Sequence, residues 1–347
     1  MPETLLEIAD LHVHYDTVRG KSRAVDGVNL TVYRGEILGI SGESGCGKST
    51  LAAAVLRLVK PPGYIGGGVV RLHPRDGTSI DLLSAEESDV RRVRWRRLSY
   101  VPQGSMNSLN PVMRIEDQFT DAITAHSNFS KRDARRMVPE LLRQVGLGAH
   151  VARMYPHELS GGMKQRVCIA IAIALKPDLV IADEPTTALD VNVQRLIIQT
   201  LADLRDQMGM TLIIVTHDMA VHAELCDRVA VMYAGDIVEV GDVRQIFKEP
   251  RHPYTRALIH SIPKVGGVRT RLGGIGGNAP SPLAWPQGCR FHPRCSQVMA
   301  RCFADTPRLL PLDTTANGSG PSPIVACHLY PEQDGSRVTT ALTPVPQ

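Results

Sequence analysis

GESGCGKST, residues 42–50, is the stretch around which the chain is organised. It fits the P-loop pattern G-x-x-x-x-G-K-[ST], which is specific where a strand precedes it and a helix follows it. Both flanks are present, because residues 37–40 (ILGI) form an apolar run typical of a buried strand and residues 51–58 (LAAAVLRL) are good helix formers. The sequence therefore predicts a strand, a glycine turn and a helix in that order.

The glycines of this turn let its backbone N–H groups point inward, and the start of the following helix adds the positive end of its dipole. Such a turn attracts phosphate. Lys48 is expected to reach the outer phosphates of a nucleotide, and the Ser49 hydroxyl to bind Mg²⁺. A glycine turn with an unrelated lysine is the alternative, which the two flanks disfavour. The expected nucleotide-binding residues are Gly42, Ser44, Gly45, Cys46, Gly47, Lys48, Ser49 and Thr50.

Length and composition indicate a globular protein of two domains. The chain has 347 residues, of which 43% are hydrophobic and 21% charged. Its longest apolar run, residues 167–175, is about half of the ~20 residues that cross a bilayer. The N-terminal residues 1–16 show neither the basic nor the apolar region of a secretory signal. We therefore expect a cytosolic location, where the seven cysteines remain reduced.

Apolar runs and helix-forming segments alternate up to about residue 250, which predicts an α/β core with a mainly parallel sheet. The early strands have less helix between them and predict a small antiparallel layer. Ser84 with Glu87 predicts a capping box that opens a short helix. From residue 251 proline and glycine are frequent and periodicity is weak. We therefore expect two domains, residues 1–250 and 251–347.

A second candidate for phosphate chemistry is residues 179–184, which read LVIADE. An apolar strand that ends in two carboxylates suits phosphoryl transfer. Asp183 can hold Mg²⁺ directly or through a water, and Glu184 can position and polarise the attacking water. The alternative is an acidic pair that caps a helix before Pro185.

Residues 159–163 (LSGGM) place Ser160, Gly161 and Gly162 at the start of a predicted helix. A serine hydroxyl and free N–H groups at a positive helix end suit a γ-phosphate. One fold does not need two turns of this kind for one nucleotide, whereas two chains that face each other need both. The sequence therefore predicts a nucleotide site shared between two chains.

Together these motifs resemble the nucleotide-binding subunit of ATP-binding cassette (ABC) transporters, in which LSGG[QM] completes the ATP site of the opposite subunit. The resemblance implies a P-loop NTPase core of ABC type, with an antiparallel β subdomain and a helical subdomain at about residues 104–175. It also implies roles for four further residues. These are adenine stacking by Tyr15, Mg²⁺ contact and coupling to the membrane domain by Gln103, a D-loop at Asp190 and γ-phosphate contact by His217.

The last hundred residues resemble the C-terminal extension of oligopeptide and dipeptide importer ATPases. The resemblance rests on residues 252–255 (HPYT), residues 288–295 (GCRFHPRC) and residues 326–329 (ACHL). Residues 108–111 (SLNP) also fit that group. The loop after Gln103 departs from it, because residues 104–105 are Gly-Ser where relatives usually have an acidic residue and proline.

Four cysteines in this extension predict a metal site. Their spacing is C-x5-C-x6-C-x24-C, which is wider than the two to four residues usual for structural zinc. It suits a [4Fe–4S] cluster held by four thiolates, as the family resemblance also implies. Zinc and plain reduced thiols remain the alternatives. The residues concerned are Cys289, Cys295, Cys302 and Cys327.

The resemblance implies an ATPase that powers peptide import at the cytoplasmic face of a bacterial plasma membrane, with ATP and Mg²⁺ as cofactors. Its expected partners are a second ATPase that forms a heterodimer with it, two permease subunits and an extracytoplasmic solute-binding protein, without nucleic acid. Nickel chelates and glutathione are alternative substrates. Two different functions also remain open at this point: an ABC-type ATPase of DNA repair or translation, and a redox or iron sensor that uses ATP as a switch.

Overall fold

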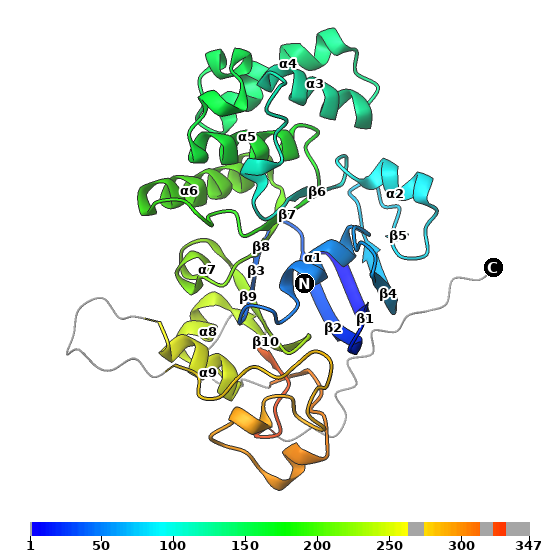
Figure 1. Ribbon diagram of the computed structural model, residues 1–347, viewed down its shortest axis with the longest axis vertical. Helices are drawn as coiled ribbons and strands as arrows, with labels where there is room; N and C mark the ends of the chain where they lie inside the picture. The colour runs from blue at the N-terminus through cyan, green and yellow to red at the C-terminus, as the bar shows by residue number, and fades with distance from the viewer. Residues whose placement is uncertain (1, 263–273, 313–321, 331–347) are drawn as a thin grey trace.

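A computed structural model describes residues 2–262, 274–312 and 322–330 of the chain. Two β-sheets, with helices packed against them, build the molecule (Figure 1). Within those ranges, none of the helices combines the length and the apolar character that a bilayer crossing requires.

The larger sheet has eight strands in the order β11-β12-β10-β9-β3-β8-β7-β6. Its five strands from β9 to β6 are parallel, and the others pair antiparallel. Strands β3, β7 and β8 are buried along their whole length, as expected where helices cover both faces. The bounds are β3 Ile37–Ser41, β6 Leu98–Val101, β7 Leu179–Asp183, β8 Thr211–Val215, β9 Arg228–Tyr233 and β10 Asp236–Asp242.

The smaller sheet is antiparallel, with the order β2-β1-β4-β5, and corresponds to the predicted antiparallel layer. One apolar cluster joins its inner face to helix α1 (Lys48–Val55) and to one face of the larger sheet. Helix α1 therefore lies between the two sheets, as Figure 1 shows. The strands are β1 Thr4–Thr17, β2 Gly20–Tyr33, β4 Gly63–Leu72 and β5 Ile80–Asp81.

A second apolar cluster covers the opposite face of the larger sheet. Helices α3, α4 and α5 gather at one end of the molecule, and α7, α8 and α9 lie toward the other (Figure 1). The apolar face of each helix accounts for this packing. The bounds are α3 Ile115–His126, α4 Lys131–Gln144, α5 Gly161–Ile173, α6 Val191–Met208, α7 Met219–Leu225 and α8 Val243–Lys248.

Residues after 250 include regular elements as well as irregular backbone. Helix α9 (Pro253–His260) begins at a His252 cap, whose Nδ1 accepts a hydrogen bond from the backbone of Tyr254. Strands β11 (Leu310–Pro311) and β12 (Ile324–Val325) extend the larger sheet at the edge of β10. The extension is thus joined to the cassette by strand pairing.

The capping box predicted at Ser84 is wrong. Helix α2 (Glu87–Val93) begins after Glu86, and no side chain caps it. The Ser84 hydroxyl instead donates to the Asp81 carboxylate at 2.9 Å, because a nearby turn offers it a stronger acceptor.

Candidate functional site

The P-loop connects β3 to α1, as the sequence predicts. Lys48 is buried, and its Nζ donates to the carbonyl oxygens of Gly42 at 2.7 Å and Glu43 at 3.2 Å. Gly47 has a φ of +111°, and a Cβ there would lie 2.3 Å from the backbone oxygen of Ala24. The loop is therefore wrapped around the lysine ammonium and packed tightly against β2.

Ser49 and Asp183 meet at the end of β7, although 134 residues separate them. The Ser49 hydroxyl donates to Asp183 Oδ1 at 3.1 Å, and the Tyr100 hydroxyl donates to Asp183 Oδ2 at 3.2 Å. Burial raises the pKa of Asp183, and these two hydrogen bonds oppose that rise. A hydroxyl and a carboxylate beside the P-loop are ligands that suit Mg²⁺.

Glu184 is surrounded by donors. His217 Nδ1 lies 2.7 Å from Glu184 Oε1, and the hydroxyls of Thr187 and Thr216 donate to Oε2 at 2.8 and 3.3 Å. Burial by itself raises the pKa of Glu184, but the hydrogen bonds from His217 and Thr187 outweigh it and lower the pKa. The carboxylate therefore stays ionised, as a base for water requires.

The backbone of Glu184 has a φ of +50°, which is unusual for a residue with a side chain. Its amide is held by the carbonyl of Val215 at 2.8 Å, across to the neighbouring strand β8. This conformation turns the Glu184 side chain toward His217, which follows β8. Strain at a functional position is a common feature of active sites.

Three residues with implied roles make no hydrogen bond to these groups in the described part of the chain. Tyr15 lies on β1, half-buried against Gly63. Gln103 is exposed just after β6. Asp190 is exposed and caps α6, accepting from the Val193 amide at 3.0 Å.

The LSGGM stretch opens helix α5 as predicted. The Ser160 side chain caps this helix by accepting from the Met163 amide at 3.3 Å. Ser160 and Gly161 are exposed, whereas a Cβ on Gly162 would lie 2.3 Å from Val193 Cγ1 of α6. Among the described residues, no hydrogen bond joins this helix start to the P-loop of the same chain.

The four cysteines of the extension lie near one another. Cys289 and Cys302 are buried, and the Cys289 amide donates to the Cys302 carbonyl at 2.9 Å. Burial raises the pKa of Cys289, Cys295 and Cys327, the last to about 11, and neighbouring thiols raise each further. Backbone N–H groups also point at sulfur, as at Cys295, where the Gln297 amide lies 3.4 Å from Sγ.

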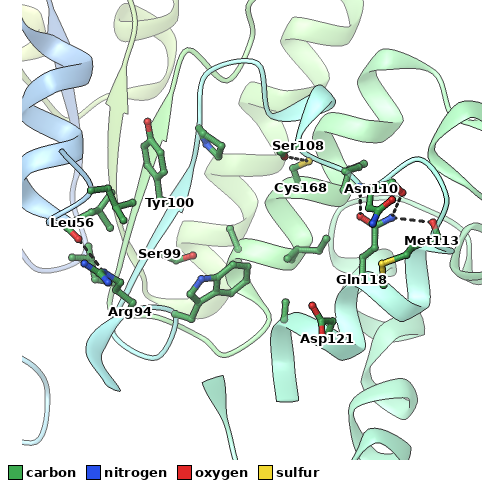
Figure 2. Close-up of a pocket in the computed structure, with 18 residues that line it drawn as sticks. Leu56, Arg94, Ser99, Tyr100, Ser108, Asn110, Met113, Gln118, Asp121 and Cys168 are labelled. Atoms are coloured by element: carbon green, nitrogen blue, oxygen red, sulfur yellow. Dashed lines mark hydrogen bonds between the residues drawn. The ribbon is translucent and has the colours of Figure 1, made fainter. Parts of the chain in front are cut away.

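A cavity of about 490 Å³ lies between the helical end and the sheets (Figure 2). Tyr100 and Cys168 border it from β6 and α5, and Ser108 and Met113 border it from the loop that follows Gln103. Val112, which precedes Met113 in that loop, is 80% exposed. The cavity therefore connects the surface of the loop to Tyr100, which contacts Asp183.

In the described ranges, the only three metal-binding side chains with ligand atoms within 4.8 Å of one another are His12, His14 and Asp26. Arg23 and Arg290 both pair with the Asp26 carboxylate, at 3.2 and 2.8 Å. Two cations on one carboxylate oppose a further cation there. We regard this group as a polar network that supports the fold.

Sequence reasoning missed three partners of the site. Tyr100 lies on β6, before the first residue of a recognisable motif, Gln103. Thr187 lies in a turn whose sequence matches no motif. Only Thr216 could have been recognised from the sequence, because it directly precedes His217 after β8. A hydroxyl next to a candidate histidine could have been included.

Comparisons with known proteins agree with this geometry. Residues 25–187 match the ABC transporter family, and residues 238–302 match the C-terminal region of oligopeptide/dipeptide transporters. The dipeptide transport ATP-binding protein DppD of Caldanaerobacter subterraneus is 43% identical over 94% of this chain and 98% of its own. The oligopeptide transport ATP-binding protein AppD of Bacillus subtilis is 40% identical over 95% and 98%.

The chain is also similar to solved structures of ABC transporter cassettes. The dimeric ABC transporter cassette MJ0796 is 28% identical, with a TM-score of 0.60, and the match covers 69% of this chain and 99% of that one. The cassette cbiO1 of Clostridium perfringens is 26% identical, with a TM-score of 0.59 over 71% and 92%. These matches confirm the predicted fold class, a P-loop core of ABC type. The chain therefore belongs to the ABC transporter family of ATP-binding proteins, in its oligopeptide/dipeptide transporter group.

Proposed function

We propose that this chain hydrolyses ATP to ADP and phosphate and thereby powers the import of peptides. The observation that carries the proposal is the convergence of two pairs at one edge of the sheet. Ser49 meets Asp183 beside the P-loop, and Glu184 meets His217. One pair suits a magnesium ion and the other suits an attacking water.

In this proposal the P-loop amides and Lys48 bind the phosphates. Ser49, Asp183 and Gln103 hold Mg²⁺, which neutralises the phosphate charge. Glu184 accepts a proton from the attacking water, and its low pKa keeps it ready to do so. The His217 side chain is 60% exposed. It can therefore leave Glu184 and contact the γ-phosphate instead. Tyr15 stacks on the adenine.

The second phosphate-binding turn is proposed to serve a partner ATPase. Ser160, Gly161 and Gly162 open α5 away from the chain's own P-loop, so a facing chain must receive them. Asp190 lies near the same surface at the start of α6. A dimer of two facing ATPases, which we propose to be a heterodimer, accounts for both turns. MJ0796, a similar cassette, has been solved as a dimer.

The membrane partners are proposed to be two permease subunits, supplied with peptide by an extracytoplasmic solute-binding protein. The support is the resemblance to dipeptide and oligopeptide transport ATP-binding proteins along most of the chain. The cavity beside the Gln103 loop, which Ser108 and Met113 of that loop border, is a suitable place for a permease segment. The chain would then lie at the cytoplasmic face of the bacterial plasma membrane.

The extension is proposed to hold a [4Fe–4S] cluster at Cys289, Cys295, Cys302 and Cys327. A closed zinc site with Zn–S bonds of ~2.3 Å holds its sulfurs about 3.8 Å apart. In the described part of the chain, no three of these sulfurs lie within 4.8 Å of one another, a wider spacing than a closed zinc site has. N–H groups directed at sulfur also suit a cluster, whose potential they adjust.

ATP hydrolysis is tested by Glu184→Gln in the full chain. We expect turnover to fall by about a hundredfold or more while ATP binding remains, because the amide cannot accept the proton. Glu224→Gln, at an exposed position of α7, is the matched control and should leave turnover unchanged. Unchanged turnover in Glu184→Gln would refute the role of this residue.

The importer assignment is tested by affinity purification of the chain from detergent-solubilised membranes. Two permease subunits and a second ATPase should purify with it. Nucleic acid or ribosomes in their place would overturn the assignment.

The cluster is tested by anaerobic purification followed by metal analysis. Iron and sulfide should be found at about four each per chain, and Cys302→Ser should lose them. Cys168→Ser, a buried cysteine outside the extension, should keep them. Zinc, or protein without metal, would contradict the proposal.

A further inference from the structure

Residues 289–295 (CRFHPRC), which we call the cysteine turn, connect the extension to the P-loop. The turn places an arginine beside each of two cysteines, Arg290 after Cys289 and Arg294 before Cys295. Both arginines point into the cassette, with side chains only 16% and 4% exposed. A buried arginine requires partners of opposite charge, and both find them.

The partner of Arg294 lies within the P-loop itself. Its Nη1 and Nη2 atoms donate to Glu43 Oε2 and Oε1 at 2.7 and 2.9 Å, which is a bidentate pair. Arg294 also lies 3.3 Å from the Tyr233 hydroxyl. The glutamate is thus held by a residue 251 positions later in the chain.

Two further contacts support the same loop. The Tyr254 hydroxyl of α9 accepts a hydrogen bond from the Glu43 amide at 2.9 Å. Arg290 donates to the Ala234 carbonyl at 2.7 Å, and the adjacent Gly235 amide donates to the carbonyl of Cys46 at 2.9 Å. The extension therefore reaches the P-loop through Glu43 on one side and Cys46 on the other.

We propose that the cysteine-bearing extension positions the P-loop for ATP, and that Arg294 is the positioning residue, acting through Glu43. An unpaired Glu43 carboxylate would repel the phosphates, since like charges at short range are unfavourable. Arg294 neutralises this charge and fixes the side chain. The inference rests on the proposed ATP site. It assigns to the extension an effect on nucleotide affinity.

The test measures the dissociation constant of MgATP for the full chain, together with KM and kcat of its ATPase activity. Arg294→Gln should weaken ATP binding by about tenfold, the scale of one charge-assisted pair, with a larger change in KM than in kcat. Arg294→Lys keeps the charge and should recover part of the affinity. Arg308→Gln, which removes an exposed arginine of the same extension, is the control and should bind ATP normally.

The double variant Glu43→Gln/Arg294→Gln decides the mechanism. Because the repelling carboxylate is gone, it should bind ATP as well as Glu43→Gln alone. The proposal would be overturned if wild type and Arg294→Gln bound ATP with equal affinity. It would also be overturned if the fold-loss of ATP affinity in the double variant were the product of the fold-losses in the two single variants. Glu43→Gln keeps the test informative if Arg294→Gln does not fold. A wild-type chain that binds no ATP would refute the ATP site itself.

Discussion

Two glycines of the P-loop have different surroundings. Gly47 has a φ of +111° and would place a Cβ 2.3 Å from a backbone oxygen, whereas Gly45 has a φ of +82° and open space around it. We expect Gly45→Ala to cost about 1 kcal/mol of stability, from backbone strain alone. Gly47→Ala should cost about 3 kcal/mol or more, because strand β2 or the loop must also move.

Urea unfolding of the two variants measures this difference, and ATP binding provides a second readout. The Gly47 variant should also lose most of its ATP binding. Equal losses of stability in the two variants would show that the contact with Ala24 does not constrain the loop.

At the residue scale, the proximity of Ser49 and Asp183 could be predicted, because a hydroxyl and a carboxylate both suit the Mg²⁺ that accompanies a nucleotide. The sequence assigns Mg²⁺ to Ser49 and to Asp183, and in the structure the Ser49 hydroxyl lies 3.1 Å from Asp183 Oδ1. The Arg294–Glu43 pair could not be predicted, because 251 residues separate the two and neither occurs in a pattern that requires the other. Such a pair depends on how the extension packs against the cassette.

At the element scale, helix α9 depends on a buried histidine. His252 and His222 are fully enclosed, and burial lowers their pKa values to about 3 and about 4. A histidine whose folded pKa is lowered binds its proton more readily in the unfolded state. Its stabilising contribution is therefore complete above pH 6.5 and is lost as the pH falls toward the folded pKa.

Acidification from about pH 6.5 to pH 5 should lower the free energy of unfolding by about 2 kcal/mol through His252 alone. Protonation of Nδ1 would also remove the cap of α9. Asp236 acts in the opposite direction, because burial raises its pKa to about 6. The contribution of His252 is therefore measured as the difference in the free energy of unfolding between wild type and a His252 variant over the same pH range.

His252→Asn supplies that difference, because asparagine can cap a helix but does not titrate. Its free energy of unfolding should fall less steeply than that of wild type from about pH 7 to pH 5. Parallel curves for the two proteins would mean that His252 does not contribute to acid sensitivity.

Long periodic elements could be predicted closely. The amphipathic pattern of residues 115–126 and 191–208 predicts a helix over each range, and the structure has α3 and α6 with those bounds. Strands β11 and β12 have only two residues each, too few to produce a pattern, and their place depends on the free edge of β10. Ser84 shows the other difficulty, because a local acceptor competed with the helix end.

At the scale of the whole molecule, the proposed ATP site is divided between two surfaces. The P-loop lies between the sheets, whereas Ser160 lies at the start of α5 in the helical group (Figure 1). In this proposal neither surface alone would surround a nucleotide. This division explains why binding and hydrolysis should respond differently to changes at the two places.

We therefore expect Ser160→Arg to leave ATP binding by the isolated chain unchanged but to lower turnover of the assembled transporter by at least about tenfold, because a bulky cation blocks the facing site. Ser130→Arg is a matched control. Ser130 caps α4 in the same way, with its side chain accepting from the Asp133 amide. Both variants lose a helix cap, worth about 1 kcal/mol, but only one lies on the proposed shared surface. Turnover and thermal unfolding measured side by side separate the two effects, and equal turnover in the two variants would refute a shared site.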